Sequence, residues 1–342
     1  MKVARLYDYL DIRIEEDPTP EPGPHEAVVR MRACGICSGD VVPWYIRKKA
    51  PLVFGHEPAG EIAAVGSAVR SFAVGQRVFV HHHAPCLVCR ACQRGEYVQC
   101  PVWKETNIRP GGMAEYFLVP RVNLEHDTLV LPDDVSFEAA ALIEPTACVV
   151  KSMRRAGDVN GATVLIIGLG VMGQLHVLLA RAAGAKRIVA CDLVEERCRH
   201  AAGLGADHVI DASRTRLEEA VADVTEGAGA EVVIAGPATT QAIDLALKCV
   251  ARGGTVVQFM GTPPGAKLEL DTFDYYFREI RLVPSYSCGP PDTREALRLI
   301  ERGIVLPAHV VTDRFPLEEA ARAYENAAKR TAAIKTLVVA ES

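Results

Sequence analysis

Residues 163–182 read TVLIIGLGVMGQLHVLLARA, in which a glycine-rich turn joins a β-branched apolar run to a helical run. The turn is Gly168-Leu169-Gly170-Val171-Met172-Gly173. Its first glycine permits a tight turn, the second lets the backbone approach a pyrophosphate, and the third lets the helix pack closely on the strand. The unpaired N–H groups at the start of the helix can then bind the phosphates. The stretch therefore predicts a dinucleotide-binding unit.

Asp192 supports this prediction, because it ends the next predicted strand, nineteen residues after Gly173. Its carboxylate can accept hydrogen bonds from both hydroxyls of the adenosine ribose and would repel the 2′-phosphate of NADP. Alternatively, it caps the helix that follows, and the two roles are compatible. Arg197 is expected to cover the adenine or to lie on a solvated helix face rather than to bind a 2′-phosphate. We therefore predict NAD as the cofactor, in preference to NADP.

The pattern changes along the chain. From about residue 160, short β-branched runs alternate with helical segments, at 163–167, 187–191, 208–210, 231–234 and 255–259. This alternation predicts parallel βαβ units with right-handed crossovers. The earlier part is β-rich, with strands expected at 27–31, 59–65, 77–80 and 116–119, and Ser136 is expected to cap a helix. The last part predicts helices at 292–302 and 317–328 and a strand at 334–338.

Composition restricts the class of protein. The 342 residues are 49% hydrophobic and 24% charged with a net charge of −5, which fits a two-domain globular protein and gives no sign of nucleic-acid or membrane-surface binding. No apolar run approaches membrane-spanning length, and the N-terminus lacks the apolar core of a signal peptide. Eleven cysteines in such a chain favour metal ligands and reduced thiols over disulfides, so we expect a cytoplasmic protein.

Four of these cysteines lie within fifteen residues, as Cys86-x2-Cys89-x2-Cys92-x7-Cys100. A tetrahedral zinc ion takes four thiolates at about 2.3 Å, and one loop that doubles back can supply all four. Charged residues lie between them, so metal binding would be what folds this lobe. An iron–sulfur cluster is the alternative, but bacterial ferredoxin runs place the last cysteine three residues on rather than seven. The spacing predicts a structural zinc site.

A second group of metal-binding residue types is spread along the first part of the chain. Cys37 follows Ala33-Cys34-Gly35-Ile36, His56 and Glu57 follow Gly55, and Glu144 stands in Leu142-Ile143-Glu144-Pro145. Each alone is unremarkable, since an isolated cysteine is more often a core residue. Beside a cysteine-rich lobe and a dinucleotide pattern, they do not look accidental. The six remaining cysteines are expected to be small core residues: Cys34, Cys148, Cys191, Cys198, Cys249 and Cys288.

On these motifs the chain resembles the zinc-dependent medium-chain alcohol dehydrogenases, and among them the sorbitol and threonine dehydrogenase branch. The resemblance covers essentially the full length and extends to segments 110–116, 143–145 and 314–320. It implies an α/β plus β-rich fold: a GroES-like catalytic domain formed by both chain ends, at 1–147 and 286–342, with an inserted Rossmann domain at 148–285. The inserted domain would hold a doubly wound parallel sheet.

The resemblance also implies a catalytic zinc held by Cys37 and His56, with Glu57 or Glu144 completing the shell, and hence two zinc ions per chain. Neighbouring residues of a regular strand face opposite ways, so His56 and Glu57 can both bind the metal only if the chain turns there. Relatives are homodimers or homotetramers, and the strand near 282–284 is a candidate edge for pairing.

One departure from the family concerns the proton relay. Many relatives carry Ser or Thr two residues after the catalytic cysteine, where this chain has Gly39. Ser38 is one substitute, and a zinc-bound water held by Glu57 or Glu144 is another. Asp40 is expected to orient a metal ligand.

Two neighbouring runs each have two interpretations. His81-His82-His83 either lines the substrate pocket or is an exposed strand end, and the second is preferred for any single histidine. Trp44, Arg47, Lys48 and Lys49 could receive an anionic substrate group, but a solvated basic loop is preferred.

The expected reaction is the reversible oxidation of a secondary alcohol or polyol to a ketone, by hydride transfer to NAD. An alcohol releases hydride readily only when its proton leaves, and zinc with an open position lowers the pKa of a bound oxygen. A zinc reductase of an aldehyde or bulky cyclic ketone is a second interpretation. A catalytically inactive cofactor-binding scaffold is a third.

Overall fold

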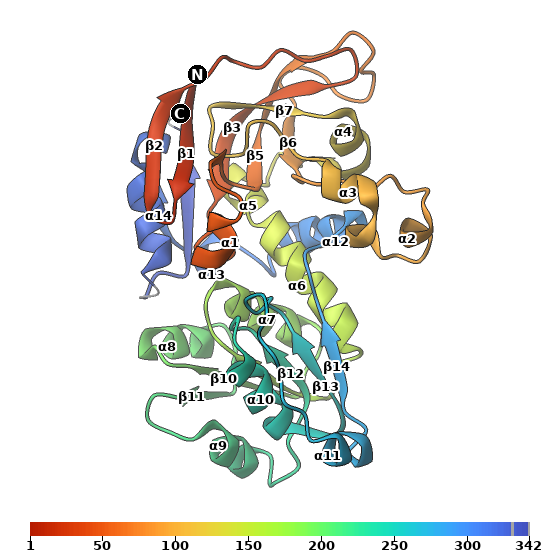
Figure 1. Cartoon of the computed structure of the whole chain (residues 1–342), viewed down its shortest axis with the longest axis vertical. Helices are drawn as coiled ribbons and strands as arrows, with labels where there is room; N and C mark the ends of the chain where they lie inside the picture. The colour runs from red at the N-terminus through yellow and green to blue at the C-terminus, as the bar shows by residue number, and fades with distance from the viewer. Residues whose placement is uncertain (330–331, 341–342) are drawn as a thin grey trace. The chain divides into compact units, whose positions relative to one another are not determined.

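The computed structural model describes residues 1–329 and 332–340. The chain forms two compact units, one of Met1–Ala147 with Cys288–Ser342 and one of Cys148–Ser287. We call the first the terminal unit, because it contains both chain ends, and the second the inserted unit (Figure 1). Within the described residues, no helix has the length and the apolar character needed to span a bilayer.

The inserted unit is built on a parallel sheet of six strands in the order β11-β10-β9-β12-β13-β14. The strands are β9 (Thr163–Ile167), β10 (Arg187–Asp192), β11 (His208–Asp211), β12 (Ala230–Ala235), β13 (Val250–Gln258) and β14 (Arg281–Pro284). The helices are α7 (Val171–Ala182), α8 (Glu195–Gly203), α9 (Leu217–Val224), α10 (Thr240–Cys249) and α11 (Thr272–Phe277), while α6 (Ile143–Ala156) enters from the terminal unit.

Strand β9 lies at the centre of this sheet, and all five of its residues are buried. Alternate residues pack into two separate apolar cores, Val164 and Ile166 in one and Leu165 and Ile167 in the other. A sheet covered on both faces in this way is the doubly wound arrangement that the sequence predicted.

The terminal unit contains two sheets, one of seven strands with β15-β16-β3-β5-β6-β8 in order and β7 paired to β3, and one of three strands in the order β2-β1-β4. The strands are β1 (Lys2–Asp8), β2 (Asp11–Glu16), β3 (Ala27–Gly35), β4 (Leu52–Val53), β5 (Glu57–Val65), β6 (Arg77–Val80), β7 (Tyr116–Val119), β8 (Thr128–Val130), β15 (Val311–Phe315) and β16 (Lys335–Val339). The helices are α1 (Pro43–Arg47), α2 (Arg90–Gln93), α3 (Pro101–Glu105), α4 (Arg121–Asp127), α5 (Phe137–Ala140), α12 (Pro290–Glu301), α13 (Pro307–Val310) and α14 (Ala320–Ala328), with 3-10 turns η1 (Tyr97–Gln99) and η2 (Leu317–Glu319).

The C-terminal segment completes the core of the N-terminal segment. Tyr324 of α14 is fully buried in one apolar cluster with Leu6, Met31 and Phe117, and its ring packs edge-on against Phe54 at a centroid distance of 5.6 Å. Residues that are far apart in the sequence therefore share one apolar core.

Most of the predicted elements are confirmed, including the helix cap, where Ser136 Oγ accepts the Ala139 N–H at 3.1 Å. Strand β13 differs, because it begins at Val250, ahead of the predicted range 255–259. Gly253, with φ of 72°, interrupts the apolar run that the prediction followed. The strand continues through this point because its register with β12 shifts there, as in a β-bulge.

Candidate active site

Pairing of β3 with β5 brings Cys37, His56 and Glu57 together. Gly35, the last residue of β3, pairs with Glu57, the first residue of β5. Cys37 lies just beyond the end of one strand and His56 just before the start of the other. One ligating atom of each of the three residues lies within 4.8 Å of the other two. His56 lies outside the regular strand, which begins at Glu57, so the two side chains need not face opposite ways; Gly55, just before them, adopts φ of 88°.

Asp40 stands directly behind His56. Its Oδ1 lies 3.4 Å from His56 Nδ1, and the residue is only 3% exposed. Burial opposes protonation of His56, but the charges of Asp40 and Cys37 outweigh it and raise the pKa of His56 well above its ordinary value. The Tyr324 hydroxyl donates to the backbone oxygen of Asp40 at 2.6 Å, which fixes the loop that carries it. This is the geometry expected of a carboxylate that orients a metal-binding imidazole.

Glu57 is fully buried and carries two different oxygens. Lys335 Nζ donates to Oε2, whereas Oε1 has no hydrogen-bond partner among the described residues. A buried carboxylate oxygen without a partner is costly unless a cation completes its surroundings. A thiol, an imidazole and a carboxylate also form a donor set that catalytic zinc sites use. The residues present therefore fit a zinc ion.

Glu144 belongs to a different group of potential ligands in the terminal unit. It is 4% exposed, and one of its oxygens lies within 4.8 Å of a ring nitrogen of His81 and of His82. Of the two carboxylates proposed to complete the zinc shell, Glu57 is the one grouped with Cys37 and His56 in the described part of the chain.

The preferred interpretation of residues 81–83 as an exposed strand end is wrong. His81 is fully buried: its Nδ1 lies 2.7 Å from Asp127 Oδ2, and its Nε2 lies 3.6 Å from Cys288 Sγ. The His82 ring lies 4.8 Å from the His56 ring, so the run adjoins the candidate zinc ligands. The chain is covered here because helix α4, which carries Asp127, folds over the end of β6, a contact between residues 46 positions apart.

The four cysteines of the lobe also converge, with all four sulfurs within 4.8 Å of one another. The Cys89–Cys92 and Cys86–Cys100 sulfur pairs are each 3.6 Å apart. Tetrahedral zinc with bonds of about 2.3 Å requires sulfur separations of roughly 3.8 Å. The backbone N–H groups of Val88 and Cys89 lower the pKa of Cys86 to about 6, which favours the thiolate. This donor set fits a structural zinc ion.

The glycine turn has the geometry that its sequence predicts. Gly168 adopts φ of 87°, and α7 begins directly after Gly170. A Cβ at Gly173 would lie 2.0 Å from the backbone oxygen of Gly168, so only glycine allows the helix to approach the strand this closely. Val171 and Met172 form the first turn of α7, where N–H groups are available to phosphates.

Asp192 ends β10 and faces the glycine turn. Its Oδ2 accepts the Leu169 N–H at 2.6 Å and its Oδ1 accepts the Val194 N–H at 2.9 Å. The carboxylate therefore orders the turn as well as the start of the segment leading into α8, a contact that the sequence pattern did not reveal. The Arg197 guanidinium lies nearby, with Nη1 3.9 Å from the position that a Cβ on Gly170 would take.

Gly39 lies beside the Cys37 sulfur. A Cβ on Gly39 would lie 3.6 Å from Cys37 Sγ, so a hydroxyl at this position would stand over the sulfur, and glycine supplies none. The Gly39 N–H instead donates to Cys37 Sγ at 3.3 Å. Ser38 is half-buried between them in sequence.

The basic run 47–49 is solvated, but part of it belongs to helix α1 rather than to a loop. Arg47 is paired with Asp8 at 2.9 Å, Lys48 and Lys49 are exposed, and Lys49 Nζ lies 4.0 Å from the Tyr45 ring centroid. Among the six cysteines expected in the core, Cys148 is only half-buried, whereas the other five are buried.

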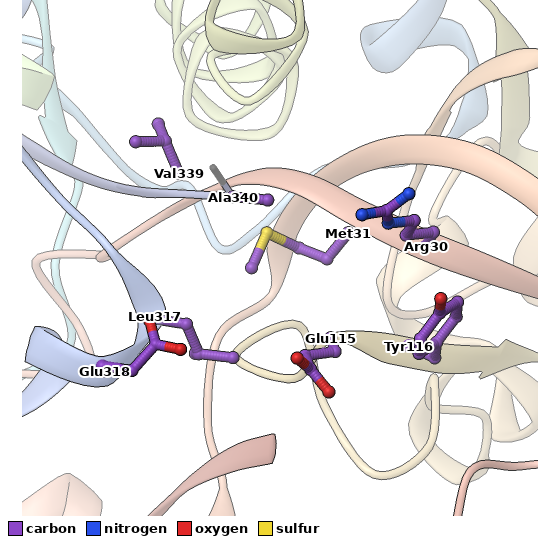
Figure 2. A pocket seen from close by; sticks show the side chains of 8 residues that line it. All are labelled: Arg30, Met31, Glu115, Tyr116, Leu317, Glu318, Val339 and Ala340. Carbon is purple, nitrogen blue, oxygen red and sulfur yellow. The ribbon is translucent and has the colours of Figure 1, made fainter. Parts of the chain in front are cut away.

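A cavity of about 220 Å³ lies elsewhere in the terminal unit, beside β3 and the end of β16. Figure 2 shows Met31, Leu317, Glu115 and Glu318 around it. None of the described residues that line it is a predicted site residue. The cavity is therefore separate from the candidate metal sites.

Two family models match the chain, the Alcohol dehydrogenase GroES-like domain over residues 23–131 and the Zinc-binding dehydrogenase over residues 171–302. The sorbitol dehydrogenase of Bacillus subtilis (strain 168) is 32% identical over 339 residues, covering 96% of this chain and 93% of that protein. The L-threonine 3-dehydrogenase of Rhizobium johnstonii is 32% identical over 318 residues, covering 90% and 89%.

Solved structures agree with these relatives. A Sinorhizobium meliloti 1021 protein bound to NADP superposes with a TM-score of 0.88 at 32% identity, covering 99% of this chain and 98% of that one. An Escherichia coli CFT073 alcohol dehydrogenase complexed with NADH gives a TM-score of 0.89 at 25% identity, covering 99% of each chain. On this evidence, the chain belongs to the zinc-dependent medium-chain alcohol dehydrogenase family and is an alcohol dehydrogenase that works with zinc and a nicotinamide cofactor.

Proposed function

We propose that this enzyme oxidises a secondary alcohol or polyol reversibly to a ketone, with NAD as the hydride acceptor and a zinc ion at Cys37, His56 and Glu57. The observation that carries the proposal is the buried group of these three side chains, in which Glu57 Oε1 has no hydrogen-bond partner among the described residues. When bound, zinc supplies a Lewis acid that lowers the pKa of an alcohol hydroxyl, so that hydride can leave the adjacent carbon.

The protein's own residues hold and orient the reacting groups. Cys37 and His56 would fix the ion, and Asp40 would keep the His56 ring in one orientation through the 3.4 Å contact with Nδ1. Glu144, which lies beside His81 and His82, is the second carboxylate available near this point. Because Gly39 carries no hydroxyl, we assign the alcohol proton to Ser38 or to Glu144, the carboxylate that is not assigned to the metal.

The choice of NAD over NADP rests on Asp192. Solved relatives include one chain bound to NADP and one complexed with NADH, so the family likeness favours neither. A carboxylate at the end of β10 can accept hydrogen bonds from the ribose hydroxyls, whereas a 2′-phosphate beside it would be repelled. The phosphates would bind the N–H groups at the start of α7.

We propose polyols as the first substrate class to examine. The relatives include sorbitol dehydrogenases and D-xylulose reductases that align with nearly all of this chain. The basic side chains of Arg47, Lys48 and Lys49 are solvated or paired, which gives no support to a carboxylated substrate.

A structural zinc at the four-cysteine lobe and a homo-oligomer complete the proposal. In the inserted unit, β14 is an edge strand of the sheet, and the preceding helix α11 exposes Phe273, Tyr276 and Phe277 by 73%, 72% and 57%. An edge strand beside exposed aromatic rings is the kind of surface that pairs with a second copy. The eleven free cysteines support a reducing compartment such as the cytoplasm.

The test is the initial rate of NAD⁺ reduction by the purified enzyme with polyols, small secondary alcohols, threonine and cyclic alcohols, before and after chelation of zinc. We expect one class to be oxidised, with NAD⁺ preferred over NADP⁺ and with activity restored by zinc. Turnover that survives complete removal of zinc would contradict the proposal.

A further inference from the structure

We propose that Lys335 is a positioning residue for the metal at Cys37 and His56: it holds one oxygen of Glu57 so that the other is presented to the ion. This inference rests on the zinc role proposed above for Cys37, His56 and Glu57. It assigns a function to a side chain that lies 278 residues from Glu57 in the sequence.

The fold delivers Lys335 to this point by strand pairing. Strand β16 runs antiparallel to β3, with Leu337 opposite Gly35, so its first residue, Lys335, lies beyond the end of β3. There Nζ donates to the backbone oxygen of Ile36 at 3.0 Å and to Glu57 Oε2. The Lys335 side chain is completely excluded from solvent. Lys335 therefore bridges the strand end that leads to Cys37 and the carboxylate that begins β5.

Gly35 leaves the space in which this bridge fits. A Cβ at Gly35 would lie 1.8 Å from Glu57 Oε2 and 2.7 Å from Lys335 Cε. Any side chain at this position would displace the two interacting groups from each other. The close approach of Lys335 to Glu57 is thus built into the backbone at the end of β3.

The contact with Lys335 gives the two oxygens of Glu57 different surroundings. Oε2 accepts from Lys335, while Oε1 is buried and has no hydrogen-bond partner among the described residues. A carboxylate oxygen of Glu57 lies within 4.8 Å of the ligating atoms of Cys37 and His56. With Oε2 held by the ammonium group, the carboxylate cannot rotate freely, and we assign Oε1 to the metal.

Stability alone does not account for a buried ammonium group here. A buried ion pair is expensive to desolvate, and an apolar pair of similar volume is often as stable or more so. A positive charge this close to a cation site would also weaken metal binding by direct repulsion. Both costs are understandable if the lysine acts through Glu57, because partners that orient metal ligands strengthen binding by about 10- to 100-fold.

The experiment measures zinc affinity of the full-length protein by competition with a chromophoric chelator. It compares the wild type with Lys335→Met, Glu57→Gln and the double variant. Cys37→Ser isolates the zinc bound by the four-cysteine lobe, and Lys2→Met removes an exposed lysine, paired with Glu318, that should have no effect. Cobalt substitution adds a spectroscopic readout, since the visible bands report the ligands of the metal.

We expect Lys335→Met to weaken the Cys37 zinc by about 10- to 100-fold and to shift the cobalt bands, with the lobe zinc unchanged. In the Glu57→Gln background, Lys335→Met should leave the zinc affinity unchanged or increase it, because the benefit through the carboxylate is already lost and the direct repulsion of the metal is removed. Unchanged or tighter zinc binding in Lys335→Met, or an equal loss in both backgrounds, would overturn the inference.

Two further outcomes are distinguishable. If Lys335→Met does not fold, Lys335→Gln takes its place, since its amide keeps a polar group beside the buried Glu57 carboxylate, and the same results are expected of it. If Cys37→Ser loses no zinc relative to the wild type, the proposed catalytic metal itself is refuted, and the inference falls with it.

Discussion

The four-cysteine lobe and the Cys37 site both gather metal-binding side chains at one point, but the chain reaches that point by different routes. In the lobe, all four sulfurs come from fifteen consecutive residues that contain only the short elements α2 and η1. At the Cys37 site, the side chains come from the ends of β3 and β5, and Asp40, Tyr324 and Lys335 support them. We therefore expect the lobe to depend on its proposed metal for its shape, and the Cys37 site to depend on the sheet.

This difference determines what loss of zinc should do. The lobe has only a small apolar cluster, formed around Val98 and Trp103, so we expect the ion proposed there to fold it, as in zinc fingers. Strands β3 and β5 are instead held by their own hydrogen bonds and by a large apolar core, so the Cys37 site should keep its fold when empty. Metal loss should therefore abolish activity at one site and local structure at the other.

The largest effect is expected for Cys37→Ser, which removes one proposed ligand of the sheet-built site. We expect kcat/KM to fall by at least about 10³-fold, because Lewis-acid stabilisation is worth several kcal/mol and about 1.4 kcal/mol is a factor of ten. The melting temperature and NAD⁺ binding should stay close to those of the wild type. Steady-state kinetics together with calorimetry would check both, and retained turnover or gross unfolding would contradict the account.

Cys92→Ser should instead disturb the local structure of the four-cysteine lobe. Cys92 is 5% exposed within the lobe, and losing one of four ligands removes much of a binding free energy that reaches about 10–16 kcal/mol in zinc-finger peptides. We expect amide hydrogens of residues 86–105 to exchange at least about 10²-fold faster, with the sheets unaffected. Cys198→Ser, a buried cysteine of the inserted unit, is the matched control. Unchanged exchange in the lobe would show that it folds without metal.

The dinucleotide site is intermediate between the lobe and the Cys37 site in how far apart its residues lie in the sequence. The glycine turn is one short segment, but Asp192 comes from the next strand. Replacing Asp192 with Ser should raise the NADP/NAD ratio of kcat/KM by about 10- to 100-fold, because a like charge beside the 2′-phosphate costs several kcal/mol. NAD⁺ affinity should also fall, since the Leu169 N–H loses its acceptor. A ratio that does not move would refute the cofactor assignment.

The smallest effect is expected at the solvated basic run. Lys49→Ala removes an exposed side chain that contacts the Tyr45 ring, and surface changes of this kind alter stability by no more than about 0.5 kcal/mol. KM for the best alcohol should not change. A large rise in KM would instead favour an anionic substrate and revive the reductase interpretation.

Sequence reasoning succeeded where the information is local. The glycine turn, the cysteine spacing and the Ser136 cap each depend on residues within one short segment, and the structure agrees with the geometry expected of them. Sequence reasoning failed where a side chain contacts a residue that is distant in the sequence. The burial of His81 depends on Asp127, 46 residues away, and the role of Lys335 depends on a strand near the other end of the chain. A lone lysine in a short apolar strand carries no local signal of its partner.

The contrast between a metal-folded lobe and a sheet-built catalytic site is tested most directly by anomalous scattering at the zinc edge from crystals of the wild type and of Cys37→Ser. We expect two peaks per wild-type chain, one among the four lobe cysteines and one beside Cys37, His56 and Glu57. In Cys37→Ser only the lobe peak should remain, with the fold intact. A single wild-type peak confined to the lobe would contradict the central claim.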